Sequence, residues 1–513
     1  MHKNYYITTP IYYPSAKPHM GHAYSSILAD FFARFKRMDE YKVHFLTGTD
    51  EHGLKIQRAA EKKNINTLAF CDEISQTFRN LSKQLNLTNT DFIRTTEERH
   101  KKTVQYLWNK LKDNDEIYLS KYSGWYSVSD EAYYNNNEIK EEDGKKFSIS
   151  SGSSVEWIEE ESYFFRLSKW QNKLLKYFDD NPEFISPKSR KNEVISFVKS
   201  GLKDLSISRK TFSWGIKVPE NQDHVIYVWL DALTNYLSSL NYSNPEDNLF
   251  KDFWPASVHL IGKDILRFHA IYWPAFLMAA EIPLPLKVYG HGWILSGDEK
   301  MSKSKGNILD PIEVIGKYGL DQLRYYLIKE VSFGNDGNIS YDKLEDCINS
   351  DLANNYGNLC QRVVSFAEKN CSSKVPENIK FNNDDLKILN KFSNNLENLR
   401  IEIDNLNVNF YINFIVNSLF EANKYFNDQE PWKKKDNKDR LNTIVYTSLE
   451  IIRKITFLLY PIIPDSIKKS LKIFDLNEKD VNFSSIGLHT YLKSGKSINK
   501  IEILFKKIEK TND

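Results

Sequence analysis

The stretch that decides the fold is residues 5–38, YYITTPIYYPSAKPHMGHAYSSILADFFARFKRM. Its first part, Tyr5 to Ile11, is rich in β-branched and aromatic residues, which predicts a strand. From Ser25 to Met38 apolar residues recur at the spacing of one helix face. The residues of this face are Ile27, Leu28, Phe31, Phe32 and Phe35. Another strand-like run follows at Lys42 to Thr47, and the alternation predicts α/β architecture with a doubly wound parallel sheet.

The rest of the chain changes character twice. Between about Ile117 and Phe212 it becomes aromatic, acidic and rich in Asn, Gly and Ser, which predicts an inserted module of hairpins. The α/β pattern resumes with HVIYVWLDAL and VHLIGKDILRFHAIYW, so the first domain is expected to be split in sequence. From about Asp346 amphipathic helical patterns predict a helix bundle. Lysines accumulate beyond about Ser470, where we expect a peripheral tail.

Composition sets limits on the class of protein. The chain has 513 residues, enough for about two to four structural units, with 41% hydrophobic and 27% charged residues. No apolar run reaches the roughly 20 residues that cross a bilayer, so no membrane partner is expected. The formal charge of +2 gives no evidence about nucleic acid. The first strand begins too early for a targeting segment, which predicts a cytoplasmic location.

The four cysteines form neither a CxxC pair nor a dense disulfide pattern, so buried or free thiols are expected. They are Cys71, Cys347, Cys360 and Cys371.

A pair of histidines stands between the first predicted strand and helix, in Pro18-His19-Met20-Gly21-His22. A helix N-terminus offers unpaired N–H groups and a positive dipole end, and imidazoles three positions apart can face one anion. Gly21 has no Cβ, so an adenine ring can lie flat against the backbone there. The pattern suits a triphosphate, although an isolated motif of this kind more often marks histidines that only cap a helix.

A lysine-rich string, KMSKSKGN at residues 300–307, follows the strand-like VYGHGWIL. Lysines and hydroxyls on a Gly-flanked loop can close on phosphates and neutralise charge that develops as pyrophosphate leaves. The competing interpretation is a solvated charge run. Because both strings occur in one chain, in this order and around an α/β domain, the phosphate interpretation is favoured.

HMGH and KMSKS resemble the two signatures of class I aminoacyl-tRNA synthetases, and the other strings resemble the methionyl-tRNA synthetase family. These strings are TTPIYYP, GTDEHG, YVWLDAL and GKDILRFH, and the likeness covers essentially the whole chain. The resemblance implies a Rossmann-like catalytic domain with an inserted connective module, followed by an all-α anticodon-binding helix bundle. It also implies a methionine-tRNA ligase, which activates L-methionine with ATP to the adenylate and transfers it to the 3′-terminal adenosine of tRNA(Met).

The resemblance carries roles onto individual residues. For catalysis it implies His19 and His22 on the triphosphate, Lys303 as the principal cation on the leaving pyrophosphate, and Lys300 in loop closure. The residues implied in ATP binding are His19, Gly21, His22, Asp264, Gly290, His291, Gly292 and Lys303. Mg²⁺ is expected with ATP, bound mainly by phosphate oxygens.

The methionine pocket must be apolar and polarizable around the thioether yet hold one ammonium group. Asp50, in the loop after a predicted strand, is implied to bind that ammonium. The side-chain pocket is implied at Ile11, Tyr13, Trp229, Ala232, Tyr236 and His269, with Phe268 beside it. Each of these aromatics taken singly is better explained as core packing.

Two further features bear on the family. The insertion is too short for a hydrolytic editing domain, and its stretch YLSKYSGWYSVSDEAYYNNNE has no cysteine or histidine, so no structural zinc is expected. In the helical part, Asn358, Arg362 and Trp432 match the family's anticodon-reading positions, where an indole and an Asn/Arg pair can stack on and bond to RNA bases. Without the resemblance, Trp432 would be a helix-end packing residue and Arg362 a surface charge.

We therefore expect six segments. Residues 1–116 and 226–290 are the halves of the catalytic domain, and 117–225 is the connective insertion between them. Residues 291–345 carry the KMSKS loop and a stem-contact region, 346–470 the anticodon-binding domain, and 471–513 the C-terminal tail. The extra dimerising domain of some relatives is not found, so a monomer is expected.

Other functions stay open at this point. A cysteinyl or other class I enzyme is the nearest, although a cysteinyl enzyme should hold a zinc thiolate site, which the scattered cysteines do not provide. A nucleotidyltransferase that acts without RNA would not need the helical third. An inactive tRNA-binding paralogue should have damaged signatures, whereas His19, His22, Lys300, Lys303 and Asp50 are intact.

Overall fold

The structure is a computed structural model, and it describes residues 3–14, 17–130, 132–134, 136–296, 299–300, 309–331 and 334–509. Contacts group the chain into two compact units. The sheet unit comprises Asn4–Pro18 and Val43–His291, and the helical unit comprises Met1–Lys3, His19–Lys42 and Gly292–Asp513. These units divide the chain at other positions than the six expected segments, whose boundaries stay predictions.

The sheet unit is built on a six-stranded sheet in the order β3, β2, β1, β14, β15, β9. Parallel pairing joins β1 to β14, β14 to β15, β15 to β9 and β2 to β3. The strand order reverses between β1 and β14, which confirms the doubly wound prediction. The strands are β1 Asn4–Tyr12, β2 Lys42–Thr49, β3 Asp91–Arg94, β9 Ile185–Ser186, β14 Val258–Gly262 and β15 Val288–His291.

Large apolar side chains fill the core of this unit. Trp108, Trp273 and Phe276 are completely buried, and the apolar run after Phe268 forms a π-helical turn followed by a buried helix. The helices of the unit are α2 Leu54–Lys63, α3 Thr67–Gln84, α4 Glu98–Asp113, α5 Gln171–Asp180, α6 Lys188–Lys199, α7 Val228–Leu233, α8 Asn235–Ser238, α9 Leu249–Phe253 and α10 Trp273–Ala279.

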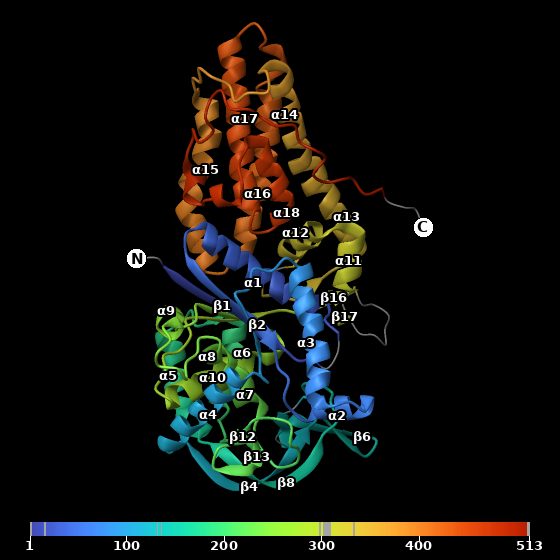
Figure 1. Cartoon of the computed structure of the whole chain (residues 1–513), viewed down its shortest axis with the longest axis vertical. Helices are drawn as coiled ribbons and strands as arrows, with labels where there is room; N and C mark the ends of the chain where they lie inside the picture. Colours follow the sequence, from blue (N-terminus) through green and yellow to red (C-terminus); the bar gives the residue numbers. More distant parts are fainter. Residues whose placement is uncertain are drawn as a thin grey trace. The chain divides into compact units, whose positions relative to one another are not determined.

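Apart from β9, which joins the six-stranded sheet, the strands of the inserted module pair antiparallel, and this confirms the predicted hairpins. Strand β4 (Ile117–Ser127) pairs with β8 (Glu156–Phe165) along most of its length, and both are seen at the lower edge of Figure 1. Aromatic pairs support this ribbon, with Tyr118 stacked on Phe164 at 5.6 Å and Trp125 edge-on to Trp157 at 5.1 Å between ring centroids. The shorter strands are β5 Ala132–Tyr134, β6 Ile139–Glu142, β7 Lys145–Ser148, β10 Leu205–Ser206, β11 Ser208–Arg209, β12 Lys217–Val218 and β13 Asn221–Ile226.

The helical unit confirms the predicted bundle, whose helices α14 to α17 run side by side in yellow to red in Figure 1. These helices are α14 Asn358–Asn370, α15 Asn383–Asp404, α16 Val408–Asp428, α17 Lys438–Leu459 and α18 Pro464–Leu471. The smaller elements are α11 Pro311–Tyr318, α12 Leu320–Glu330, α13 Tyr341–Cys347, the π-helical turn Ile348–Gly357, β16 Ile294–Ser296, β17 Glu299–Lys300 and β18 Gly337–Asn338. Among the helices described, none is long and apolar enough to cross a membrane.

The first long helix, α1 (Met20–Met38), belongs to the helical unit. It begins at Met20 rather than at the predicted Ser25, because Met20 is buried and His19 caps the helix together with His22 of its first turn. Its Phe31 ring lies 5.4 Å from the ring of Tyr411 on α16. Asp30 accepts a hydrogen bond from the buried Arg324 of α12 at 2.7 Å, so α1 is fixed by both apolar packing and a buried ion pair.

The prediction of a peripheral tail beyond Ser470 is wrong. Phe483 and Ile486 are completely buried, and the Phe483 amide donates to the carbonyl of Met38 at 2.9 Å. The segment is largely irregular, so its apolar residues follow no helical or strand period and the sequence does not reveal their burial.

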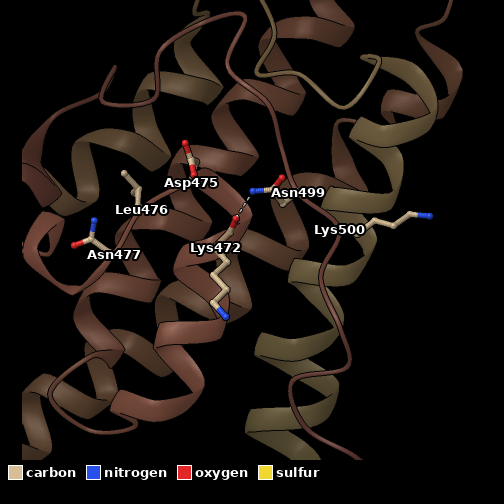
Figure 2. A pocket seen from close by; sticks show the side chains of 6 residues that line it. All are labelled: Lys472, Asp475, Leu476, Asn477, Asn499 and Lys500. Carbon is tan, nitrogen blue, oxygen red and sulfur yellow. Dashed lines mark hydrogen bonds between the residues drawn. The ribbon is translucent and has the colours of Figure 1, made fainter.

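Further along, the same segment packs against the end of α18. The Asn499 side-chain amide donates to the Lys472 carbonyl at 2.7 Å, beside a shallow pocket shown in Figure 2. This pocket is lined by Lys472, Asp475, Leu476, Asn477, Asn499 and Lys500. The C-terminal residues are therefore a structural part of the bundle.

The cysteines confirm the expectation of free thiols. Cys71, Cys347 and Cys360 are buried and Cys371 is half-buried, and all four are unpaired with each other.

Candidate active site

Predicted ligand residues gather where parallel strands of the sheet unit end. Tyr13 follows β1, Asp50 follows β2, Asp264 follows β14, and Gly290 and His291 end β15. The carboxyl ends of parallel strands meet at one edge, and a doubly wound sheet binds its ligand there, beside the point where the strand order reverses. Because that reversal lies between β1 and β14, the structure brings these five residues to the edge expected of a binding site.

An aromatic wall forms part of the predicted methionine pocket. The Trp229 ring, on α7, lies parallel to the Phe268 ring, with 3.5 Å between centroids and 10° between planes. Ala232, one turn further along α7, is buried, and Ile11 is half-buried at the end of β1. A large apolar and polarizable surface of this kind suits a thioether side chain.

Tyr236 and His269, two polar residues of the predicted methionine pocket, are hydrogen-bonded to each other. His269 Nδ1 lies 3.0 Å from the Ile265 carbonyl and therefore carries the proton of the neutral ring, so Nε2 accepts from the Tyr236 hydroxyl at 2.7 Å. Burial lowers the pKa of His269 to about 4 and raises the pKa of Tyr236 above its usual value. Both side chains are neutral at pH 7, as a pocket for an uncharged thioether requires.

The sequence did not reveal a second buried histidine in this network. Trp273 Nε1 donates to His259 Nε2 at 3.3 Å, so His259 Nδ1 carries the proton and donates to the Thr8 hydroxyl at 2.9 Å. The His259 ring stacks on Tyr236, with 4.0 Å between centroids. Burial lowers the pKa of His259 well below its usual value. Its position inside the apolar strand β14 makes it look like a core residue, and no local signal distinguishes it.

Asp50 lies in a loop whose backbone and neighbouring Glu51 are held by hydrogen bonds. Its amide donates to the Tyr12 carbonyl at 2.9 Å, and its side chain is almost fully buried. The neighbouring Glu51 carboxylate accepts two hydrogen bonds from Arg94, at 2.7 and 3.0 Å. The Trp214 indole donates to the Glu51 carbonyl at 2.6 Å. This loop places a carboxylate at the sheet edge with little freedom to move.

A buried carboxylate holds the other side of that loop. Asp231 lies 2.7 Å from His52 Nδ1 through one oxygen and 2.7 Å from His100 Nε2 through the other. Burial would raise the pKa of Asp231, but the two facing histidines lower it below its usual value. His52 and Asp231 both stand inside family-like strings, GTDEHG and YVWLDAL, which was the available signal for a role that sequence reasoning did not assign.

The paired histidines of HMGH open helix α1, as predicted. His19 Nδ1 accepts from the Gly21 amide at 3.1 Å, and His22 Nδ1 accepts from the His19 amide at 3.1 Å, which makes a reciprocal cap. The neutral rings therefore carry their protons on Nε2. Burial, and then the neighbouring His19, lower the pKa of His22 well below its usual value. A Cβ at Gly21 would lie 3.0 Å from the His19 ring, so a larger residue would disturb the pair.

The structure gives less information on the other residues predicted to bind ATP. Asp264 is exposed in the turn that follows β14, and His291 is buried. Gly292 packs so closely that a Cβ would lie 2.1 Å from the Asn335 carbonyl oxygen, which explains glycine there. The Lys300 backbone pairs with Leu295 in a small sheet, and Lys303 lies outside the described residues.

Two of the three predicted anticodon residues, Arg362 and Trp432, lie against one aromatic ring of the helical unit. The Arg362 guanidinium lies 5.5 Å from the centre of the Phe426 ring and donates to the Asn427 side chain at 2.6 Å. Trp432 contacts the same Phe426 ring edge-on at 6.2 Å and is 41% exposed. Asn358 is exposed one helical turn before Arg362. The structure thus brings an exposed indole and a guanidinium to one surface.

Comparison with known families matches nearly the whole chain. The model described as tRNA synthetases class I (M) matches residues 5–145 and 141–364, and the model described as anticodon binding domain of methionyl tRNA ligase matches residues 375–513. Together with the doubly wound sheet and its split domain, these matches define a class I aminoacyl-tRNA synthetase.

Similar proteins narrow the class further. The methionine–tRNA ligase of Rickettsia conorii is 49% identical over 99% of this chain and 100% of its own length, and that of Brucella suis is 48% identical over 94% of each. A structure of Mycobacterium tuberculosis methionyl-tRNA synthetase in complex with methionyl-adenylate has a TM-score of 0.95 at 44% identity, covering 98% of this chain and 99% of that one. The chain belongs to the methionine–tRNA ligase family.

Proposed function

We propose that the chain catalyses the two reactions of a methionine–tRNA ligase. It activates L-methionine with ATP to methionyl-adenylate and pyrophosphate, and then transfers methionine to the 3′-terminal adenosine of tRNA(Met). The observation that carries this proposal is the match, across 98% of the chain, to a synthetase structure that contains methionyl-adenylate. The intact HMGH and KMSKS strings favour an active enzyme over the inactive paralogue.

Methionine recognition is divided between a charge and an apolar surface. The Asp50 carboxylate binds the ammonium group, while Ile11, Tyr13, Ala232 and the Trp229–Phe268 wall enclose the side chain. The neutral Tyr236–His269 pair lines the pocket for the thioether without placing a charge beside it. Support for these roles comes from the position of Tyr13 and Asp50 at the carboxyl edge of the sheet and from the neutral state of His269.

Activation needs positioning rather than a general base. The methionine carboxylate already carries its negative charge, so one of its oxygens attacks the α-phosphorus while the bond from that phosphorus to the pyrophosphate oxygen breaks. The Nε2–H groups of His19 and His22 donate to the triphosphate, and Lys303 neutralises the departing pyrophosphate with help from Lys300. ATP enters with Mg²⁺, which its phosphate oxygens hold.

The nucleotide is held by Gly21, Asp264 and the Gly290-His291-Gly292 strand end. In the second reaction the terminal ribose hydroxyl of the tRNA attacks the carbonyl carbon of the adenylate, and AMP leaves. Asn358, Arg362 and Trp432 read the anticodon, since an exposed indole can stack on a base and the Asn/Arg pair can bond to base edges.

The proposal also includes the predicted segments, except that residues 471–509 belong to the helix bundle instead of forming a tail, and a monomeric, cytoplasmic enzyme. Sedimentation of the purified chain and fractionation of the producing cells test the last two properties.

The decisive experiment is amino-acid-dependent exchange of pyrophosphate into ATP, with each of the twenty amino acids supplied separately and no tRNA. Exchange with methionine alone supports the proposal, and exchange with another amino acid would keep the class but change the substrate. Charging of purified tRNA(Met) with radioactive methionine tests the second reaction. Catalytically inactive protein that still binds the tRNA would favour the inactive paralogue.

A further inference from the structure

We infer that Asp231 is a positioning residue for methionine recognition, acting through His52 on the loop that carries Asp50. This inference rests on the proposed function of Asp50 as the ligand of the substrate ammonium. Asp231 would not touch the substrate. Its task would be to fix the direction in which the Asp50 carboxylate points.

The geometry joins the two parts of the methionine pocket. His52 is two residues after Asp50, whereas Asp231 lies on α7 between the pocket residues Trp229 and Ala232. A hydrogen bond of 2.7 Å connects His52 Nδ1 to Asp231 across 179 residues of sequence. A buried hydrogen bond therefore ties the ammonium-binding loop to the helix that carries the apolar wall.

Burial makes this contact strong and specific. Asp231 is completely buried and His52 nearly so, with 0% and 3% of their surfaces exposed. A carboxylate shielded from water must be satisfied by hydrogen bonds, and Asp231 receives one on each oxygen, from His52 and from His100. His100 is held in turn by the Ser238 hydroxyl at 2.9 Å from its Nδ1.

The two residues that follow Asp50 in its loop are thus both held by hydrogen bonds. On one side Arg94 and Trp214 fix Glu51, and on the other side Asp231 fixes His52. Asp50 is the residue next to this clamped pair. A carboxylate that binds an ammonium group gains most when its orientation is set before the ligand arrives, because the cost of ordering it is removed from binding.

Loss of the His52 contact should therefore weaken ammonium recognition more than apolar recognition. The probe that separates the two is the α-hydroxy acid of methionine, which keeps the thioether and carboxylate but has a hydroxyl in place of the ammonium. The quantity to measure is the ratio of the dissociation constant of this analogue to that of methionine. A general loss of folding would weaken both ligands and leave the ratio unchanged.

Matched variants isolate the hydrogen bond. His52→Asn keeps an N–H donor at the position of Nδ1, whereas His52→Leu removes it. His224→Leu is the control, because His224 is another buried histidine of the sheet unit, bonded to Ser208 at 2.9 Å in the inserted module's strands. We expect His52→Leu to lower the ratio about tenfold or more, with His52→Asn and His224→Leu within about threefold of the wild type.

The variant Asp50→Asn tests the proposed function of Asp50 separately from the inference about Asp231. It should lower the ratio of the dissociation constant of the hydroxy acid to that of methionine about a hundredfold. An unchanged ratio for Asp50→Asn would overturn the role of Asp50 and this inference with it. A reduced ratio for Asp50→Asn beside an unchanged one for His52→Leu would overturn only the inference. Equal losses for His52→Asn and His52→Leu would also overturn it, because the hydrogen bond would then be irrelevant.

If His52→Leu does not fold, Asp231→Asn serves instead, since it keeps the side-chain volume and cannot accept on both sides. Circular dichroism and thermal unfolding establish that each variant is folded. If folded Asp231→Asn has a lower ratio of the two dissociation constants than the wild type, the inference is supported. A wild-type ratio contradicts it.

Discussion

The proposed methionine pocket and the proposed anticodon surface are built on opposite principles. In the pocket the polar groups are buried and bonded to one another, as Tyr236 is to His269 and Asp231 is to His52. On the helix bundle, Trp432 is 41% exposed and rests its edge on Phe426, which lies beneath it. The pocket is preorganised by buried hydrogen bonds, whereas on the bundle surface the exposed Trp432 ring is supported by packing and Arg362 donates to the exposed Asn427 side chain.

The difference follows from the ligands. A small amino acid has few groups to recognise, so the protein must fix each of its own groups in advance. Unpaired RNA bases bring large flat faces, and an exposed aromatic ring can stack on them without a cavity. Substitutions in the pocket should therefore affect both reactions, and substitutions on the bundle surface should affect only the reaction that uses tRNA.

The largest expected effect belongs to Asp50→Asn. Loss of the charge that pairs with the ammonium should cost about 4 kcal/mol, roughly a thousandfold in kcat/KM for methionine. Pyrophosphate exchange and tRNA charging should fall together, while the KM for ATP changes little. Exchange at the wild-type rate would show that another group binds the ammonium.

A second effect comes from the pH dependence of the pocket. The pKa of His269 is about 4 in the folded chain and about 6.5 when unfolded, so as the pH falls below 6.5 the unfolded chain takes up the proton first. Protonation of His269 in the unfolded chain should therefore lower the free energy of unfolding by about 3 kcal/mol as the pH drops from 7 to below 4. Unfolding of wild type and His269→Gln at a series of pH values measures it, and parallel curves would contradict the buried neutral state.

Trp432→Ala tests the surface of the helix bundle. Loss of one stacking interaction should cost about 2 kcal/mol, or roughly thirtyfold in kcat/KM for tRNA, with pyrophosphate exchange unchanged. Phe420→Ala is the matched control, because Phe420 is an aromatic of the same bundle with 66% of its surface exposed. Equal losses in both assays for Trp432→Ala would refute the division between pocket and surface.

The smallest effect is expected from Tyr236→Phe, which removes one hydroxyl and leaves His269 Nε2 without its donor. The cost should be about 1 kcal/mol, or roughly five- to tenfold in the KM for methionine in both assays. Tyr425→Phe offers a comparison, since the buried Tyr425 hydroxyl donates to Asp385 within the bundle. That variant should lower thermal stability and leave the KM for methionine unchanged.

Local sequence patterns predicted much of this architecture. The alternation of strand and helix around HMGH, the hairpins of the insertion and the helical third all appear in the structure, because each depends on residues close in sequence. Arg362 and Trp432 were named through family-like positions and both contact the Phe426 ring, whereas the anticodon role of these two residues and of Asn358 stays a prediction.

Long-range partners could not be predicted in this way. Asp231 looks like an ordinary polar residue in a short helix, and only folding brings it to His52 and to His100, 131 residues away. His259 is hidden inside an apolar strand for the same reason. The segment after Ser470 was misjudged because a chain buried without regular secondary structure has no period to detect.

The burial of the cysteines has a practical consequence for labelling. Burial raises the pKa of the Cys71 and Cys360 thiols to about 12, and it raises the pKa of Cys347 and Cys371 as well. Thiolates are the species that react with maleimides, so all four native thiols should react slowly at neutral pH. A cysteine introduced at the exposed Gln361, beside Arg362, would then accept a fluorophore selectively and report tRNA binding without removal of any native cysteine.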